Sequence, residues 1–209
     1  MRITKYSHAC VRLDDGQRSL LIDPGVWATR EVYDGIDEVL VTHEHVDHVD
    51  VEALTELAAR SSSLRVHAPA SVAELLTGLG DAVHVVAPGD SFEAAGYAVD
   101  VVGGRHADIY DQLPGCANVG YVVGGSVYHP GDALFVPEHA VDTLLVPTSG
   151  PWLKLAEAID FVRAVAPRQA ISIHDALLSP IGAMVVDRWL DLKSETDYSR
   201  LADGSSVEV

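Results

Sequence analysis

One short polar loop limits what this chain can fold into more than any other segment. It reads His-Glu-His-Val-Asp-His and follows residues 38–42 (EVLVT), a run that predicts a buried strand. Residues two apart in extended or turn backbone point the same way, so His43 and His45 can approach one cation. The Asp47 and His48 side chains point away from that cation, toward a second location. A solvated surface loop is the alternative, but the buried strand directly before it argues against that reading. The spacing therefore suits two metal ions rather than one.

Three ligand-type residues further along the chain complete the set. A metal ion in a protein needs three or more protein groups, so the loop alone is insufficient for two ions. His106, Asp132 and His174 each stand at or just after the C-terminal end of a predicted strand. Together with the loop, they would complete two coordination spheres.

The order of the predicted elements indicates two sheets with helices outside. Short β-like runs separated by turn residues begin the chain, and helical periodicity follows them in each half of the sequence. Two sets of strands, each followed by helices, predict two sheets packed face to face. The predicted strands cover residues 2–6, 9–13, 19–23, 38–42, 64–68, 118–123, 126–129, 143–146 and 169–173, with short β runs between 82 and 102. Four helices are predicted. The first follows an N-cap at Asp50 and has Val51, Leu54, Leu57 and Ala58 on one face, and the second covers 70–79. The third has Leu155, Ile159, Val162 and Ala166 on one face, and the last lies near 181–192.

The length of the chain favours one domain over residues 1–209. Its 209 residues and 22.3 kDa would leave two halves near the lower limit for an independently packed core. A hydrophobic content of 48% provides ample material for one core.

The charge excludes one class of partner. There are 31 acidic and 14 basic side chains, and the net charge of −17 argues against nucleic acid, whose binding is built from clustered Lys and Arg. No apolar run approaches the length of a membrane helix, and the start of the chain lacks the apolar segment of a secretion signal. We therefore expect a cytoplasmic protein that does not bind a membrane. Cys10 and Cys116 match no metal or redox spacing and are expected to be free thiols.

The ligand-type residues, taken in chain order, resemble the signature of the metallo-β-lactamase-fold hydrolases. The match comprises Asp23 in LLIDP, THEHVDH at 42–48, His106 in GGRH, Asp132 in HPGDA and His174 in SIHDA. The resemblance implies an α/β fold, an αββα sandwich of two mixed β-sheets with helices outside and metals at one edge. It also implies the ligands: His43, His45 and His106 for the first metal, Asp47, His48 and His174 for the second, and Asp132 as the bridge.

The ligand types indicate which metal is bound. Five imidazoles and two carboxylates without a thiolate suit Zn²⁺. Mn²⁺, Fe²⁺ and Ni²⁺ stay open, because the order of affinities alone does not decide which metal occupies a site. A glutamate at position 45 is typical of the di-iron electron-transfer relatives, so histidine there favours hydrolysis.

The expected chemistry assigns a catalytic role to two carboxylates. Two divalent ions bridged by Asp132 would lower the pKa of a shared solvent molecule and so supply a hydroxide nucleophile. Asp47 is expected to orient that hydroxide and to pass its proton to the leaving group. We therefore expect a dinuclear hydrolase of a small-molecule ester, lactone or phosphodiester. A thioester or β-lactam hydrolase and a non-catalytic metal-binding or scaffold protein stay open, because ligands establish binding and not turnover.

Three further residues are expected close to the metals without binding them. In the family, Asp23 usually hydrogen-bonds a ligand loop, and an ordinary strand-ending Asp before Pro24 is the alternative. His8 and His129 are expected either to contact ligands or substrate or to be structural histidines. The remaining histidines, at positions 67, 84 and 139, match no ligand position and are expected to be structural or on the surface.

A finer resemblance concerns the branch of small hydrolases that contains ascorbate-6-phosphate lactonase. The short chain, the IDP motif and the early His8 carry it. The segment SGPWLKLAEA departs from the Met-containing segment of that branch, so its substrate is not carried over. Small relatives often associate, which leaves a homo-oligomer open.

Overall fold

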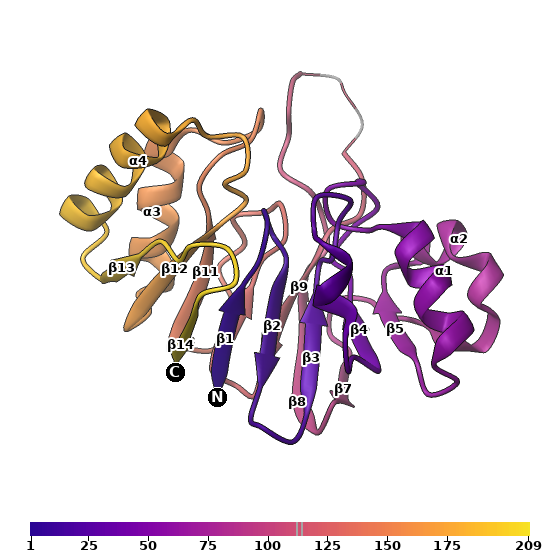
Figure 1. The fold of residues 1–209 in the computed structure, drawn as a ribbon. Coiled ribbons are helices and arrows are strands. Elements are labelled where there is room, and N and C mark those ends of the chain that lie inside the picture. Colours follow the sequence, from indigo (N-terminus) through magenta and orange to yellow (C-terminus); the bar gives the residue numbers. More distant parts are fainter. Residues whose placement is uncertain (112, 114) are drawn as a thin grey trace.

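Two sheets form the centre of the molecule (Figure 1). The computed structural model describes residues 1–111, 113 and 115–209. The first sheet has seven strands among the described residues, and its outermost strand comes from the C-terminus, where Ile3 of β1 pairs with Val207. The strand order is β14 (Ser206–Glu208), β1 (Arg2–Lys5), β2 (Val11–Asp14), β3 (Ser19–Ile22), β4 (Glu38–Leu40), β5 (Arg65–Ala68) and β6 (Val83–Val85).

The second sheet also has seven described strands and mixes the two directions of pairing. Its C-terminal half is parallel from β10 to β13, whereas its other pairs are antiparallel. The strand order is β13 (Asp197–Ser199), β12 (Gln169–Ile173), β11 (Thr143–Pro147), β10 (Val127–His129), β9 (Val119–Val123), β8 (Tyr97–Gly103) and β7 (Ser91–Ala94).

The main core lies between the inner faces of the two sheets. Leu13 and Ile22 from the first sheet belong to the same buried cluster as Val99, Tyr121 and Ile171 from the second. Alternate strand residues point to one face, so each strand supplies apolar residues to this layer. Removal of this apolar surface from water holds the two sheets together.

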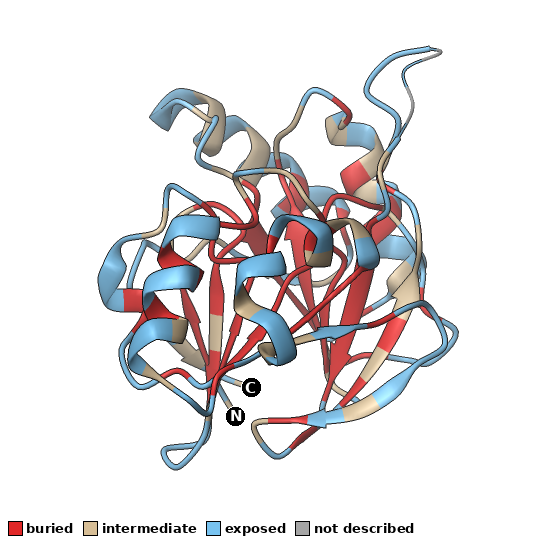
Figure 2. Ribbon diagram, turned by 90° about the vertical axis from the view of Figure 1, so that its right-hand side faces the viewer, coloured by how far each residue is buried: buried red, intermediate tan, exposed pale blue. Residues whose placement is uncertain are grey.

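Helices cover the outer faces, and the buried strands lie between them (Figure 2). The helices α1 (Val51–Arg60) and α2 (Ala70–Leu75) lie over the first sheet, and α3 (Leu155–Val165) and α4 (Pro180–Lys193) lie over the second. Short 3₁₀ turns cover Arg30–Tyr33 and Thr77–Ala82. The layers are therefore helix, sheet, sheet, helix, which confirms the predicted αββα sandwich.

Several details differ from the predictions. The helix expected over 70–79 ends at Leu75 and continues as the 3₁₀ turn. In α1, Ala53 is buried instead of the predicted Val51, because Val51 begins the helix at the exposed edge. Ala166, expected on the apolar face of α3, is its left-handed C-cap, with φ of 52°. The strands β13 and β14 were not predicted, because each is three residues long and has no buried face.

Parallel strands bring the ligand-bearing loops to one edge of the sandwich, which is the upper edge in Figure 1. The loop after β4 carries His43 to His48, and His174 follows β12 directly. β4 lies in the first sheet and β12 in the second, and each pairs in parallel with neighbouring strands. The carboxyl ends of parallel strands lie at the same edge of a sheet. The two sheets face each other with these edges on the same side, so the two loops come together although 125 residues lie between His48 and His174 in the sequence. Among the described residues, no helix is long and apolar enough to span a lipid bilayer.

Candidate metal centre

Four side chains meet at this edge and form a first group of ligand-type residues. His43, His45, His106 and Asp132 each offer one ligand atom, and these atoms lie within 4.8 Å of one another. His43 Nε2 lies 3.1 Å from His45 Nδ1, and His106 Nε2 lies 3.3 Å from Asp132 Oδ2. The structure thus brings together the three histidines expected at the first metal.

A second group of four lies beside the first. It consists of Asp47, His48, His174 and His8, again with ligand atoms within 4.8 Å of one another. His174 Nε2 lies 3.7 Å from Asp47 Oδ2. The three residues expected at the second metal are therefore together, and His8 is among them although it was expected only nearby.

Asp132 lies between the two groups. Its Oδ1 is 3.1 Å from His48 Nε2 of the second group, and its Oδ2 is 3.3 Å from His106 Nε2 of the first. The Nε2 atom of His174 also lies 3.0 Å from Asp132 Oδ2. One carboxylate therefore faces ligand atoms of both groups, as a bridging ligand must.

Several of the buried ligand atoms lack a hydrogen-bond partner, as expected of atoms that bind a metal ion. The Nε2 atoms of His48, His106 and His174 and the Oδ1 atom of Asp132 are buried without a hydrogen-bond partner among the described residues. Leaving a buried polar atom unpaired costs about 1–3 kcal/mol, so four at one point demand an explanation. Divalent cations that accept nitrogen and oxygen ligands supply it.

In two of the metal-facing rings, those of His106 and His174, the other nitrogen is held by a backbone carbonyl. His106 Nδ1 donates to the Ala107 carbonyl at 2.6 Å, and His174 Nδ1 donates to the Ser149 carbonyl at 2.6 Å. These carbonyl acceptors place the ring proton on Nδ1 and leave a free lone pair on Nε2. Both rings are therefore oriented and protonated as metal ligands require.

Asp23 fixes both ends of the histidine-rich loop. Its Oδ1 accepts from the Thr42 N–H and its Oδ2 accepts from the Thr42 hydroxyl, both at 2.7 Å. The same Oδ2 accepts from His48 Nδ1 at 2.7 Å. Because the Thr42 hydroxyl donates to Asp23, its oxygen accepts the Nδ1 proton of His43 at 3.0 Å. One buried carboxylate thus orients a histidine in each group.

The residues before Asp132 are held just as closely. The Asp132 N–H donates to Asn118 Oδ1 at 2.9 Å, and the Gly131 N–H donates to His129 Nδ1 at 3.1 Å. A Cβ atom on Gly131 would lie 2.3 Å from Asn118 Oδ1, so the turn requires glycine. His129 therefore supports the Asp132 turn and lies behind the metal-facing atoms.

The environment sets the charges of the ligands. Burial lowers the pKa of His43 well below its usual value. Burial also acts to raise the pKa of Asp132, but the surrounding His48, His106 and His174 outweigh it and hold that pKa well below the usual range. Burial lowers the pKa of His48 as well, yet Asp132 and Asp23 raise it well above its usual value without metal. A metal ion at His48 Nε2 would need the lone pair of that nitrogen, so metal binding and protonation of Nε2 compete.

Comparison with known proteins identifies the family of the chain. The model of the β-lactamase superfamily domain matches residues 2–174. The chain belongs to the β-lactamase superfamily. It is a metal-dependent hydrolase of that superfamily with the metallo-β-lactamase fold.

Relatives extend the likeness over most of the chain. This hydrolase is 38% identical to Protein Rv0786c of Mycobacterium tuberculosis, over 99% of each chain. It is 26% identical to the UPF0173 metal-dependent hydrolase MJ1163 of Methanocaldococcus jannaschii, over 82% of this chain and 83% of the relative. Its fold is similar to that of the metallo-β-lactamase fold protein YhfI of Bacillus subtilis, with a TM-score of 0.78, 14% identity and coverage of 99% and 98%.

Three contacts in this hydrolase's metal centre were not predicted. The indole N–H of Trp152 donates to Asp132 Oδ2 at 3.0 Å, and Asn118 holds the Asp132 turn. Cys116, expected to be a free thiol without a metal-site role, has its Sγ 3.9 Å from His45 Nε2. Trp152 and Asn118 both stand close to predicted strand ends, but no sequence pattern indicates where their side chains point.

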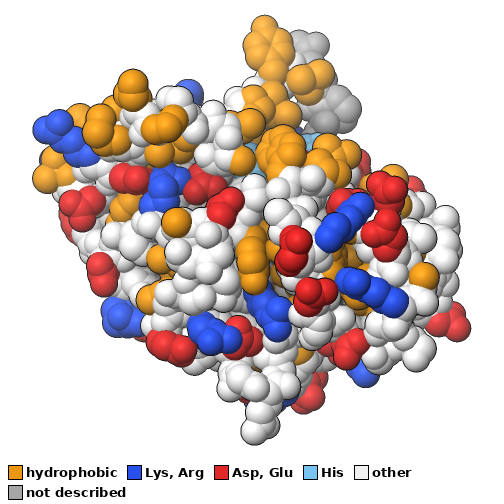
Figure 3. Space-filling view, in the orientation of Figure 1, with side chains coloured by type: hydrophobic (Ala, Val, Ile, Leu, Met, Phe, Trp, Pro, Cys, Tyr) orange, Lys and Arg blue, Asp and Glu red, His pale blue; other side chains and the backbone are white. Residues whose placement is uncertain are grey.

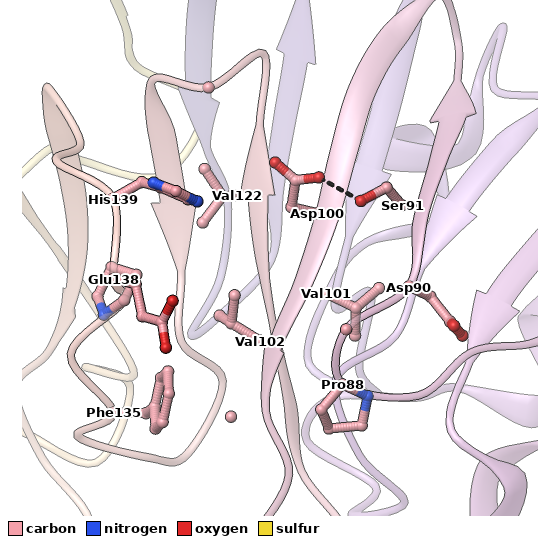
Figure 4. A pocket seen from close by; sticks show the side chains of 14 residues that line it. Pro88, Asp90, Ser91, Asp100, Val101, Val102, Val122, Phe135, Glu138 and His139 are labelled. Atoms are coloured by element: carbon pink, nitrogen blue, oxygen red, sulfur yellow. Dashed lines mark hydrogen bonds between the residues drawn. The ribbon is translucent and has the colours of Figure 1, made fainter.

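The remaining histidines of the hydrolase lie outside both groups. His67 is buried and its Nε2 lies 3.1 Å from Glu38 Oε2, while its ring stacks on Phe92. His139 lines a hollow of about 550 Å³ over β8 and β9, together with Val122 and Phe135 (Figure 4). None of the residues described along that hollow belongs to either group of ligands. A hollow of similar volume opens beside His45 and Asp47 and adjoins the metal centre.

Proposed function

We propose that this hydrolase binds two divalent metal ions and cleaves a small-molecule ester, lactone or phosphodiester. The observation that carries the proposal is the set of unpaired buried atoms, three histidine Nε2 atoms and one Asp132 oxygen, at the contact between two ligand groups. The proposed ligands are His43, His45 and His106 for one ion, Asp47, His48 and His174 for the other, and Asp132 for both.

The proposed metals are zinc ions, because the ligands are five imidazoles and two carboxylates. Mn²⁺, Fe²⁺ and Ni²⁺ bind the same ligand types, so the metal found after expression decides this point. When bound, such a pair activates water as a nucleophile and polarises the carbonyl or phosphoryl oxygen of the substrate.

Asp132 and Asp47 have different tasks in this proposal. Asp132 is buried and held by Trp152 and Asn118, so it fixes the spacing of the two sites. The Asp47 side chain is 20% exposed and lies at the mouth of the centre. From there it can accept a proton and pass it to the leaving group, as general acid–base catalysis requires.

His8 holds Asp47 and does not bind metal. The Ala176 N–H donates to His8 Nδ1 at 3.3 Å, so the proton of the neutral ring is on Nε2. That Nε2–H then donates to Asp47 Oδ2 at 3.2 Å. This is the reverse of the arrangement at His106 and His174, whose Nδ1 atoms donate to carbonyl groups. His8 is therefore a positioning residue for Asp47, although it lies among the ligand atoms.

The proposal is tested on the whole chain with and without metal. Protein loaded with Zn²⁺ or Mn²⁺ and chelator-treated protein are assayed against bis(p-nitrophenyl) phosphate and panels of lactones, aryl esters, thioesters and β-lactams. We expect metal-dependent turnover of the phosphodiester, an ester or a lactone, with about two metal ions per chain by elemental analysis. Protein that holds two ions and turns over none of these substrates would overturn the proposal. Turnover confined to thioesters or β-lactams would replace the proposed substrate class.

The expected cytoplasmic location and the small-molecule partner stay predictions. Enzyme assays with purified substrates test the second of these directly.

A further inference from the structure

We propose that an apolar rim beside the metal centre binds a hydrocarbon group of the substrate, next to the bond that is cleaved. The rim consists of Val26, Trp27, Val46 and Leu177. The inference rests on the proposed hydrolase function and adds the substrate class: an ester or lactone that carries an alkyl or aryl group.

All four rim residues are exposed. Val26 is 47% exposed, Trp27 44%, Val46 65% and Leu177 54%. Single exposed apolar residues are normal, whereas several that surround one functional centre indicate a binding surface. Hydrophobic side chains also gather beside the histidines at the upper edge of the molecule in Figure 3.

Short contacts link the rim residues to Asp47, the proposed proton-transfer carboxylate. Val46 stands directly before Asp47, and its carbonyl accepts from the Val26 N–H at 2.9 Å. The Trp27 ring meets the His8 ring edge-on, with 4.8 Å between centroids, and His8 donates to Asp47. Leu177 follows Ala176, whose N–H donates to His8. All four residues are therefore within a few contacts of Asp47.

The rim is held in place before any substrate arrives. A Cβ atom on Gly25 would lie 2.0 Å from the Asp47 carbonyl oxygen, so the 25–27 loop presses against the ligand loop at a position where only glycine fits. The Asp50 N–H donates to the Pro24 carbonyl at 3.0 Å and closes the same loop from the other side. A surface ordered in this way loses little entropy when it binds a ligand.

The charges around the metal centre indicate which kind of substrate group can bind beside it. The hollow next to α2 is lined by the carboxylates of Glu44, Asp47 and Glu74 as well as by Val46 of the rim and Leu75, and the whole chain has a net charge of −17. Carboxylates repel anionic chains and anionic lipid surfaces, and they give no favourable contact to a hydrocarbon. A neutral alkyl or aryl group is therefore expected to lie on the Val26, Trp27 and Leu177 side, with the cleaved bond over the metal ligands.

The first test measures binding without turnover. Methyl-, propyl-, butyl- and hexylphosphonate carry the same anionic head, which binds the metal centre, and differ only in the chain. Complete burial of one methylene lowers the Kd about fourfold. Because the rim is half open to solvent, we expect half of that binding free energy, which lowers the Kd about twofold for each added methylene. We expect the Kd for Zn²⁺-loaded protein, measured by calorimetry, to fall roughly eightfold from methyl- to butylphosphonate. A Kd that does not depend on chain length overturns the inference.

The second test uses matched variants. Trp27→Ala and Leu177→Ala are expected to remove most of the chain-length dependence and to keep the Kd of methylphosphonate and the metal content. Trp189→Ala is the control, because Trp189 is 43% exposed but lies near the C-terminal end of α4. If the rim is instead a contact between two copies of the chain, Trp27→Ala will change the sedimentation coefficient and leave the chain-length dependence intact, which also overturns the inference.

The two proposals can fail separately. Metal-dependent turnover of short esters together with flat chain-length dependence removes the rim and keeps the hydrolase. Chain-length-dependent phosphonate binding without turnover of any substrate keeps the apolar rim as a binding surface and removes the proposed reaction.

Discussion

The Trp152 indole N–H donates to Oδ2 of Asp132 at 3.0 Å, and both side chains are buried. Trp152 lies in the loop between β11 and α3, whereas Asp132 follows β10. A Cβ atom on Gly150 would lie 2.8 Å from the indole nitrogen, so glycine at that position leaves room for the ring. This contact ties the carboxylate shared by both ligand groups to a neighbouring loop.

Replacement of Trp152 by Phe tests the value of that contact. Phe keeps most of the buried ring but cannot donate, and a hydrogen bond to a charged group is worth about 1.5–3 kcal/mol. We expect the free energy of unfolding of metal-free protein in urea to fall by about 2 kcal/mol, with an unchanged circular dichroism spectrum. An unchanged unfolding midpoint would show that the contact contributes nothing to stability.

Asp132→Ala tests the shared ligand. The variant removes a carboxylate that faces His48 and His106, so the two sites lose a common ligand. We expect the metal content by elemental analysis to fall from about two per chain toward one, together with loss of turnover. The variant Asp142→Ala, whose carboxylate pairs with Arg168 at the exposed end of the sheet, is the control and is expected to keep both ions. Two ions in Asp132→Ala would refute the assignment.

Asp23→Asn tests the support behind both groups. The amide keeps one acceptor oxygen but points an N–H₂ group at a position where Asp23 Oδ2 now accepts from Thr42 and His48. Loss of such support lowers metal affinity roughly 10- to 100-fold. We expect a competition titration with a zinc-binding dye to show this decrease. Asp34→Asn, at an exposed position, serves as the comparison, and equal affinities in the two variants would contradict the role of Asp23.

His8 variants separate a hydrogen-bond donor from a metal ligand. His8→Gln can place an N–H near the position of Nε2, whereas His8→Ala cannot. We expect both variants to bind about two metal ions, the Ala variant to lose roughly tenfold in kcat, and the Gln variant to recover part of that loss. If His8→Ala binds only one ion, then His8 is a ligand and its assignment as a donor to Asp47 is wrong.

Much of the fold follows from local patterns in the sequence. Gln169–Ile173 is a strand with the predicted bounds, and the Asp50 side chain caps α1 by accepting from the Ala53 N–H, as its place before the apolar periodicity indicates. The strand β14 has no such pattern. Its three residues are ordered by pairing with β1 at the other end of the chain, which is a tertiary contact.

The candidate metal centre divides in the same way. The ligand types can be identified from the sequence, because imidazole and carboxylate chemistry and the spacing from His43 to His48 are local properties. The role of each ring nitrogen depends on tertiary contacts. The Ala176 N–H donates to His8 Nδ1, which leaves the His8 proton on Nε2. The His174 proton is on Nδ1 instead, where it is donated to the Ser149 carbonyl. The indole N–H of Trp152 donates to Asp132. These outcomes depend on which atoms of distant loops meet at one sheet edge, and no spacing along the chain contains that information.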